Sequence, residues 1–116
     1  SRDPAVRRLL ADLGTRIEAA RLCNYRAISI QARGEVPTVE ASIARMHNTT
    51  VEQLTGNVVM EVLGATAQLR AGDDAPLDGE ATRHWLRNIP TTVAAGTLEI
   101  QKNIVAQRGL GLPRPS

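Results

Sequence analysis

Aromatic residues are almost missing from this 116-residue sequence, which has one tryptophan, one tyrosine and no phenylalanine. Alanine, leucine, isoleucine and valine therefore supply nearly all of the apolar content. This composition favours helix-on-helix packing over a sheet, because strands are rich in aromatic and β-branched residues. The lack of aromatic stacking platforms also argues against a surface that binds nucleic acid. We therefore expect an all-α fold.

Cysteine is equally scarce, since Cys23 is the only one. A single cysteine cannot form an intramolecular disulfide, and no metal-ligand spacing surrounds it, so we expect no metal site and a location in the reducing cytoplasm. The net charge is only +2, from 14 basic and 12 acidic residues, and no basic stripe predicts a nucleic-acid partner. The sequence contains no run of 18 apolar residues, so it predicts no contact with a membrane.

Two long amphipathic helices are predicted in the first half of the chain. Asp3 and Pro4 form a cap and a first-turn proline, and apolar residues then recur every three or four positions, which predicts a helix over residues 4–32. Gly34 ends this pattern. The next apolar pattern covers more than one face of a helix, so we predict an inner bundle helix over residues 38–66.

A shorter helix is predicted after a loop of turn-forming residues at positions 72–79. It covers residues 79–89 and is expected to direct Trp85 and Leu86 inward. Pro90 then prevents the helix from continuing.

The last helix is predicted over residues 97–108, with Ile100 and Ile104 on its apolar face. Gly96 can adopt a backbone conformation closed to other residues, and the Thr97 hydroxyl can cap the helix. This start has a structural and a functional interpretation. Its free N–H groups either serve only a packed junction or form a cradle for a phosphate or a polarised carbonyl.

Residues 96–114 have the sequence GTLEIQKNIVAQRGLGLPR. This string resembles the C-terminal signature of the acyl-CoA dehydrogenase family, usually written G-T-S-E-I-Q-R-N-I-I-A-E-R-x-L-G-L-P-R. Three earlier strings resemble other helices of the same C-terminal domain: RRLLADLGTRIEAARL, ASIARMHNTTVEQLTGNVVMEVLGA and DGEATRHWLRNIPTTVAAGTLEIQ. The resemblance implies that residues 1–116 form one up-and-down helical bundle. It also implies that the first bundle helix and two further domains would precede residue 1.

The resemblance implies a function as well. Members of the family bind FAD at a subunit boundary and oxidise an acyl-CoA thioester between its α and β carbons. Electrons then pass to an electron-transfer flavoprotein or a similar acceptor. The chain is thus expected to be the C-terminal domain of such an oxidoreductase, inactive by itself and part of a homo- or hetero-oligomer.

The resemblance also assigns roles to single residues. Gly96 matches a position near the substrate thioester, and Thr97 and Glu99 match positions that touch the flavin nucleotide.

A second expected cofactor contact is the turn after the second helix, where the family has a glycine-rich flavin-binding sequence. Glu61, Gly64 and Ala65 occupy the corresponding positions, and only Gly64 is kept. Glu61 replaces an amide with a carboxylate, which a pyrophosphate would repel, so flavin binding through this turn is in doubt.

The catalytic base is the largest departure from the family. Many members have a glutamate directly before the Gly-Thr pair, where it removes the α-proton, but this sequence has Ala95 there, and a methyl group accepts no proton. Two explanations stay open: an earlier helix supplies the base, or this subunit is the non-catalytic half of a heteromeric enzyme. The small side chain of Ala95 would also leave space for a branched or ring-bearing acyl group.

A protein of a different class is the alternative. An all-helical pattern without a complete catalytic set also fits a non-enzymatic module, such as the dimerising or ligand-binding bundle of a regulator.

Overall fold

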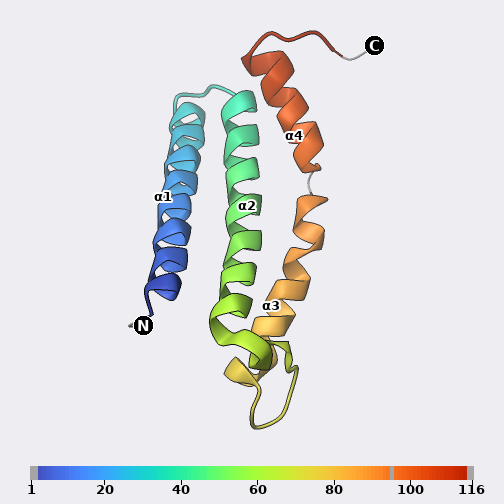
Figure 1. Cartoon of the computed structure of the whole chain (residues 1–116). Coiled ribbons are helices and arrows are strands. Elements are labelled where there is room, and N and C mark those ends of the chain that lie inside the picture. Colours follow the sequence, from blue (N-terminus) through green and yellow to red (C-terminus); the bar gives the residue numbers. More distant parts are fainter. Residues whose placement is uncertain (1–2, 95, 115–116) are drawn as a thin grey trace.

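The computed structural model describes residues 3–94 and 96–114, and these residues form only helices, turns and connecting segments. The long helices α1 (Pro4–Ala32) and α2 (Thr38–Leu63) run antiparallel and side by side (Figure 1). The shorter helices α3 (Glu80–Asn88) and α4 (Leu98–Ile104) follow along the other side of α2. Because α2 contacts all three other α-helices, it is the inner helix of the bundle, and the predicted all-α fold is confirmed.

Local capping signals define the ends of α1. The Asp3 carboxylate accepts a hydrogen bond from the Ala5 amide at 2.8 Å, and Pro4 occupies the first helical position. At the other end Gly34 has a φ of 79°, and its N–H donates to the Gln31 carbonyl at 2.9 Å. This left-handed glycine terminates the helix as predicted.

The second helix ends close to its predicted end, at Leu63 rather than at residue 66. α2 stops at Leu63 because Gly64 has φ 66° and ψ −146°, a conformation outside the helical region that essentially only glycine adopts. Residues 64–68 then form a separate 3₁₀ helix. The chain therefore turns sharply after α2 instead of continuing the helix to residue 66.

The helix after the loop is slightly shorter than the predicted range 79–89. Gly79 is left-handed, with φ 75°, and precedes α3 as its cap after a 3₁₀ turn over Pro76–Gly79. Trp85 is half-buried against α2, whereas Leu86 is 36% exposed and lines a hollow together with Met60 of α2, so its predicted inward direction is met only in part. Residues four positions apart share a helix face, and Leu86 follows the buried Thr82 by one turn.

The last predicted helix is not regular throughout. α4 covers Leu98–Ile104 and continues as a π-helical turn over Val105–Gly109. Its predicted apolar face is only partly buried, because Ile104 is half-buried but Ile100 is 52% exposed, whereas Gln101 is only 9% exposed. Packing at this helix therefore selects a polar amide for the interior.

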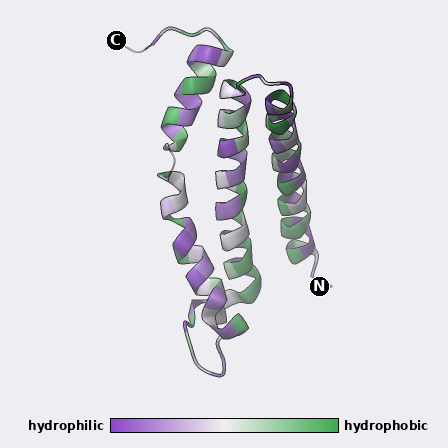
Figure 2. Cartoon of the chain, turned by 180° about the vertical axis from the view of Figure 1, so that it is seen from behind, coloured by the Kyte–Doolittle hydropathy of each residue, from purple (hydrophilic) through white to green (hydrophobic). Residues whose placement is uncertain are grey.

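Small side chains dominate the buried interior of the described residues. Gly56 of α2 shows how closely the helices approach, because a Cβ atom added there would lie 3.1 Å from Asn88 Nδ2 of α3. The buried apolar residues are Leu13, Ala20, Ala44, Val58, Ala67, Ala75 and Ala81. Apolar residues also recur along α1 (Figure 2), and several of them, including Leu10, Ile17 and Ile28, are exposed.

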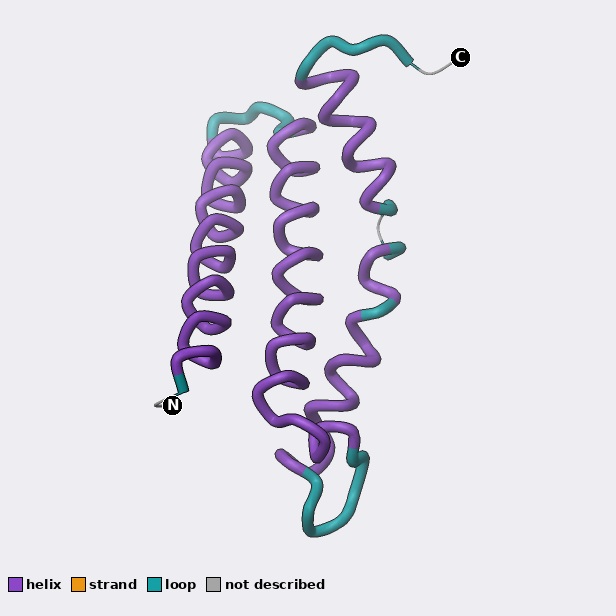
Figure 3. Tube along the Cα trace, in the orientation of Figure 1, coloured by secondary structure: helices purple, strands orange, loops and turns teal. Residues whose placement is uncertain are grey.

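The ends of the bundle are distinct. The connection between α1 and α2 lies at the same end as the described C-terminal residues, and the loop before α3 lies at the opposite end (Figure 3). Within residues 3–94 and 96–114, no helix combines the length and the apolar character needed to cross a membrane. The same ranges contain no group of three or more His, Cys, Asp or Glu side chains able to hold a metal ion.

Thr49 is buried in α2 at 1% exposure, and its hydroxyl has no hydrogen-bond partner among the described residues. Thr49→Val keeps the branched shape and removes the unsatisfied hydroxyl, so we expect the free energy of unfolding to rise by about 1 kcal/mol. Urea unfolding would measure this change. Thr55→Val is the matched control, because the Thr55 hydroxyl donates to the Val51 carbonyl at 2.8 Å. A Thr49→Val protein no more stable than wild type would contradict the prediction.

Candidate functional site

The residues that the sequence motif singled out lie at the α3–α4 junction, which we define as residues 90–97. A short 3₁₀ turn, Pro90–Thr92, follows α3. The N–H groups of Val93 and Ala94 both donate to the Pro90 carbonyl, at 3.0 and 3.1 Å. The described residues before Gly96 therefore form one compact helical turn. Ala95, the residue at the usual base position of the family, lies outside the described residues.

Arg45 of α2 holds this turn. Its Nη2 atom donates to the Thr91 carbonyl at 2.9 Å and also to the Ala94 carbonyl. Carbonyl groups at the end of a helical turn lack partners within the turn and carry partial negative charge, so a guanidinium is well suited to cap them. Arg45 was not among the residues predicted from the sequence, although its charge between the apolar residues Ala44 and Met46 was a signal.

Gly96 adopts the unusual conformation that its sequence context predicted, with φ 93°. The structure adds a second reason for glycine, because a Cβ atom at this position would lie 2.7 Å from Nε2 of Gln101. Thr97 caps α4 as predicted, since its Oγ1 atom accepts a hydrogen bond from the Ile100 amide at 3.3 Å. The junction therefore requires glycine at position 96, because the buried amide of Gln101 occupies the space that a side chain would need.

Glu99 is exposed on the first turn of α4. Its own backbone N–H, the Thr97 hydroxyl and the positive charge of Lys102 lower the pKa of the carboxyl group below its ordinary value. The N–H group of Ile100 is hydrogen-bonded to Thr97 Oγ1. It is therefore not one of the free N–H groups that an anion cradle at this helix start would need.

The second expected cofactor contact, formed by Glu61, Gly64 and Ala65, lies at the C-terminal end of α2, where all three residues are exposed. Glu61 lines a shallow depression together with Ala5, Arg8, Leu9 and Asp12 of α1. A Cβ atom at Gly64 would meet nothing within 4 Å, so glycine is required there by the backbone conformation alone.

The structure does not bring the two sets of residues together. Arg45, which contacts the junction, and Glu61 are 16 positions apart in α2. This separation corresponds to about 24 Å at about 1.5 Å per residue. Within one chain, Gly96, Thr97 and Glu99 therefore lie together at the start of α4, far from the turn after α2.

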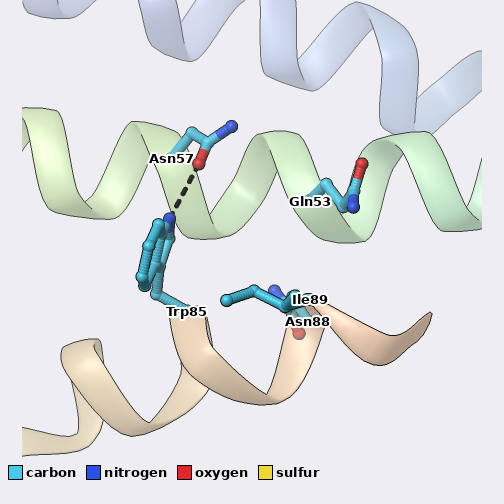
Figure 4. Close-up of a pocket in the computed structure, with 5 residues that line it drawn as sticks. All are labelled: Gln53, Asn57, Trp85, Asn88 and Ile89. Carbon is cyan, nitrogen blue, oxygen red and sulfur yellow. Dashed lines mark hydrogen bonds between the residues drawn. The ribbon is translucent and has the colours of Figure 1, made fainter. Parts of the chain in front are cut away.

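A small pocket between α2 and α3 has a volume of about 200 Å³ and is lined by Gln53, Asn57, Trp85, Asn88 and Ile89. Figure 4 shows the indole of Trp85 directed toward α2, where its Nε1 donates to Asn57 Oδ1 at 2.9 Å. Asn88 Nδ2 likewise donates to the Glu52 carbonyl at 2.8 Å. Amides and an indole that hold two helices together carry neither a nucleophile nor a titratable group. We therefore assign this pocket to packing.

Residues 1–110 match the family described as acyl-CoA dehydrogenase, C-terminal domain. Acyl-CoA dehydrogenase FadE26 of Mycobacterium tuberculosis is 33% identical over 110 residues, which cover 90% of this chain and 27% of that protein. The short-chain-specific acyl-CoA dehydrogenase of Clostridium acetobutylicum is 30% identical over 98 residues, which cover 84% of this chain and 24% of that protein.

Solved structures with the same fold were also found. The structure described as the Tcur3481-Tcur3483 steroid ACAD has a TM-score of 0.91 at 28% identity, over 98% of this chain and 30% of that one. The ChsE4-ChsE5 complex from Mycobacterium tuberculosis has a TM-score of 0.85 at 29% identity, over 99% of this chain and 29% of that one. The chain thus spans between 24% and 30% of the length of these four proteins.

Proposed function

The chain belongs to the acyl-CoA dehydrogenase family as its C-terminal helical domain, and from this premise we propose that it serves an FAD-dependent enzyme that oxidises acyl-CoA thioesters between the α and β carbons. The observation that carries the proposal is the start of the family motif, where Gly96 has φ 93° and packs against Gln101 of α4, and Thr97 caps the same helix. The family match also decides against the interpretation of the chain as part of a regulator.

Each residue of the junction has a proposed role. Gly96 lies beside the thioester, where the lack of a side chain permits close approach of the acyl group. Thr97 and Glu99 lie beside the flavin nucleotide, and the Thr97 hydroxyl holds the helix start in place. The flavin, when bound, supplies the hydride acceptor. These side chains orient the reactants and do not themselves accept the substrate proton.

The turn after α2 fits an anionic group poorly. Glu61 is an exposed carboxylate, and the carbonyl groups at the C-terminal end of α2 add partial negative charge, so both would repel a pyrophosphate. The proposal therefore restricts the cofactor contacts of Gly64 and Ala65 to backbone atoms, and no step of the reaction depends on this turn.

The proton acceptor comes from outside the described residues. Ala95 supplies no base, which leaves an earlier helix of the same chain or a catalytic partner subunit. One similar structure is called a complex of two differently named proteins, and another also carries two names. These descriptions favour a heteromeric enzyme in which a partner subunit contributes the base. The electron acceptor, an electron-transfer flavoprotein or a similar carrier, and the cytoplasmic location remain predictions.

The proposed substrate is a bulky acyl-CoA. Ala95 follows Ala94 and precedes Gly96, so three small residues in sequence leave space beside the thioester. One of the similar structures is described as a steroid ACAD, which supports a ring-bearing acyl group.

The test uses the full protein that carries this domain, purified with any partner subunit and assayed with an artificial electron acceptor. We expect bound flavin and a higher kcat/KM for a ring-bearing acyl-CoA than for a straight short chain. Ala95→Leu should lower kcat/KM for the ring-bearing substrate on the order of tenfold, whereas Ala71→Leu, at an exposed position in the loop before α3, should change it little. Absence of flavin and of acyl-CoA oxidation would overturn the proposed function. Preference for straight short chains would overturn only the proposed substrate.

A further inference from the structure

We propose that Arg45 is a positioning residue that anchors the α3–α4 junction to α2 and so orients the start of α4. The link from this anchor to catalysis rests on the proposed function, because Gly96 and Thr97 are the residues assigned to the thioester and the flavin. The anchor itself rests only on the contacts of the described residues.

Arg45 contacts the end of the turn that precedes Gly96. One nitrogen atom, Nη2 of Arg45, donates to the carbonyl groups of both Thr91 and Ala94. These two carbonyls belong to the single helical turn whose N–H groups already donate to Pro90. A charged donor shared by two carbonyls makes stronger hydrogen bonds than a neutral donor and fixes where the turn ends. The turn therefore ends directly before the motif residues.

Arg45 is also not the side chain that would give this position the greatest stability. Its side chain is half-buried, and its Nε atom is buried without a hydrogen-bond partner. None of the ion pairs formed within residues 3–94 and 96–114 involves Arg45. An unpaired cation and an unsatisfied N–H both cost desolvation energy that an apolar side chain of similar length would avoid. The need to hold the junction in place explains an arginine at position 45 better than packing does.

A second buried polar group supports the same segment. Gln101 of α4 packs with its Nε2 atom against Gly96, and its side chain is buried. Arg45 thus holds the residues that precede Gly96, and Gln101 fills the space beside Gly96 itself. Two polar side chains from different helices converge on a segment of a few residues, which is the arrangement expected where a site must be held in one geometry.

The experiment uses the full protein with its cofactor and any partner subunit. Arg45→Met removes the charge and keeps the length of the side chain, and Arg45→Lys keeps a cation that can still donate to carbonyl groups. Arg26→Met is the matched control, because Arg26 is an arginine of α1 that pairs at 3.6 Å with Glu40 of α2 rather than with the junction. Amide hydrogen exchange over residues 90–100 reports the junction directly. The kinetic constants report the site.

For Arg45→Met we expect amide exchange at Val93 and Ala94 to rise on the order of tenfold, with unchanged exchange in α1. We also expect kcat to fall at least about tenfold with little change in the thermal midpoint, because small misplacements at a reacting centre slow the chemistry strongly. Arg45→Lys should restore most of both values, and Arg26→Met should match wild type.

Two results would overturn the inference: exchange at the junction that matches wild type in Arg45→Met, or a loss of kcat that Arg26→Met reproduces. A wild-type protein that oxidises no acyl-CoA would instead count against the proposed function. The exchange measurement would still decide whether Arg45 anchors the junction.

Discussion

Gly79→Ala is expected to lower the free energy of unfolding by about 3 kcal/mol or more, which is a large part of the typical stability of a domain. Gly79 has φ 75°, and a Cβ atom there would lie 2.1 Å from the backbone carbonyl oxygen of Arg70. The contact is with backbone atoms, so no side-chain rotation can relieve it. The loop before α3 or the start of α3 has to move.

Gly34→Ala provides the matched control. Gly34 has nearly the same φ, 79°, but a Cβ atom there would meet nothing within 4 Å. This variant should lose only the cost of a left-handed non-glycine residue, about 1–2 kcal/mol. Urea unfolding of both variants and wild type, followed by circular dichroism, gives the comparison. Equal losses in the two variants would show that the contact with Arg70 does not matter.

Gly96→Ala is expected to lower kcat/KM for acyl-CoA oxidation on the order of 100-fold in the full enzyme. The backbone of Gly96, at φ 93°, is strained for any residue with a side chain, and the new methyl group would displace the amide of Gln101. Both effects shift Gly96 and Thr97, which the proposed function places beside the thioester and the flavin. Steady-state kinetics with the preferred acyl-CoA measures the loss.

Two further variants separate the causes of this loss. Gly111→Ala changes another glycine with positive φ, 69°, where a Cβ atom would meet nothing within 4 Å, so its kcat/KM should stay near wild type. Gly96→Ala combined with Gln101→Ala removes the steric contact and keeps the backbone strain. If Gly96→Ala alone had wild-type kinetics, the assignment of Gly96 to the substrate site would be wrong.

Much of the architecture could be predicted because its signals are local in the chain. Asp3 caps the helix that begins at the next residue, and Gly34 terminates the same helix by its own backbone conformation. Thr97 caps a helix that starts one residue later. Such interactions involve neighbours within a few positions, so the residue types alone indicate them. The family resemblance extended these predictions to the order of the helices, and the comparisons confirm it.

The errors arose where contacts between segments distant in sequence determine which residues are buried. Periodicity placed Ile100 inside and gave Gln101 no role, but the space beside Gly96 accommodates the amide, and Ile100 is exposed. Leu86 was predicted to face inward, yet it keeps 36% of its surface exposed beside Met60 of α2. A hydrophobic pattern ranks the faces of a helix by composition, whereas the shape of the partner helix determines which face is buried.

By itself the sequence determined the helical class, the long helices with their caps, the family and the residue positions of the motif. Tertiary structure alone revealed that Arg45 reaches Thr91 and Ala94, carbonyl groups 46 and 49 positions away, and that Glu61 and Gly96 lie far apart. The physical reason is that capping and helix propensity act over a few residues, while a hydrogen bond between helices exists only after packing has brought its two ends together.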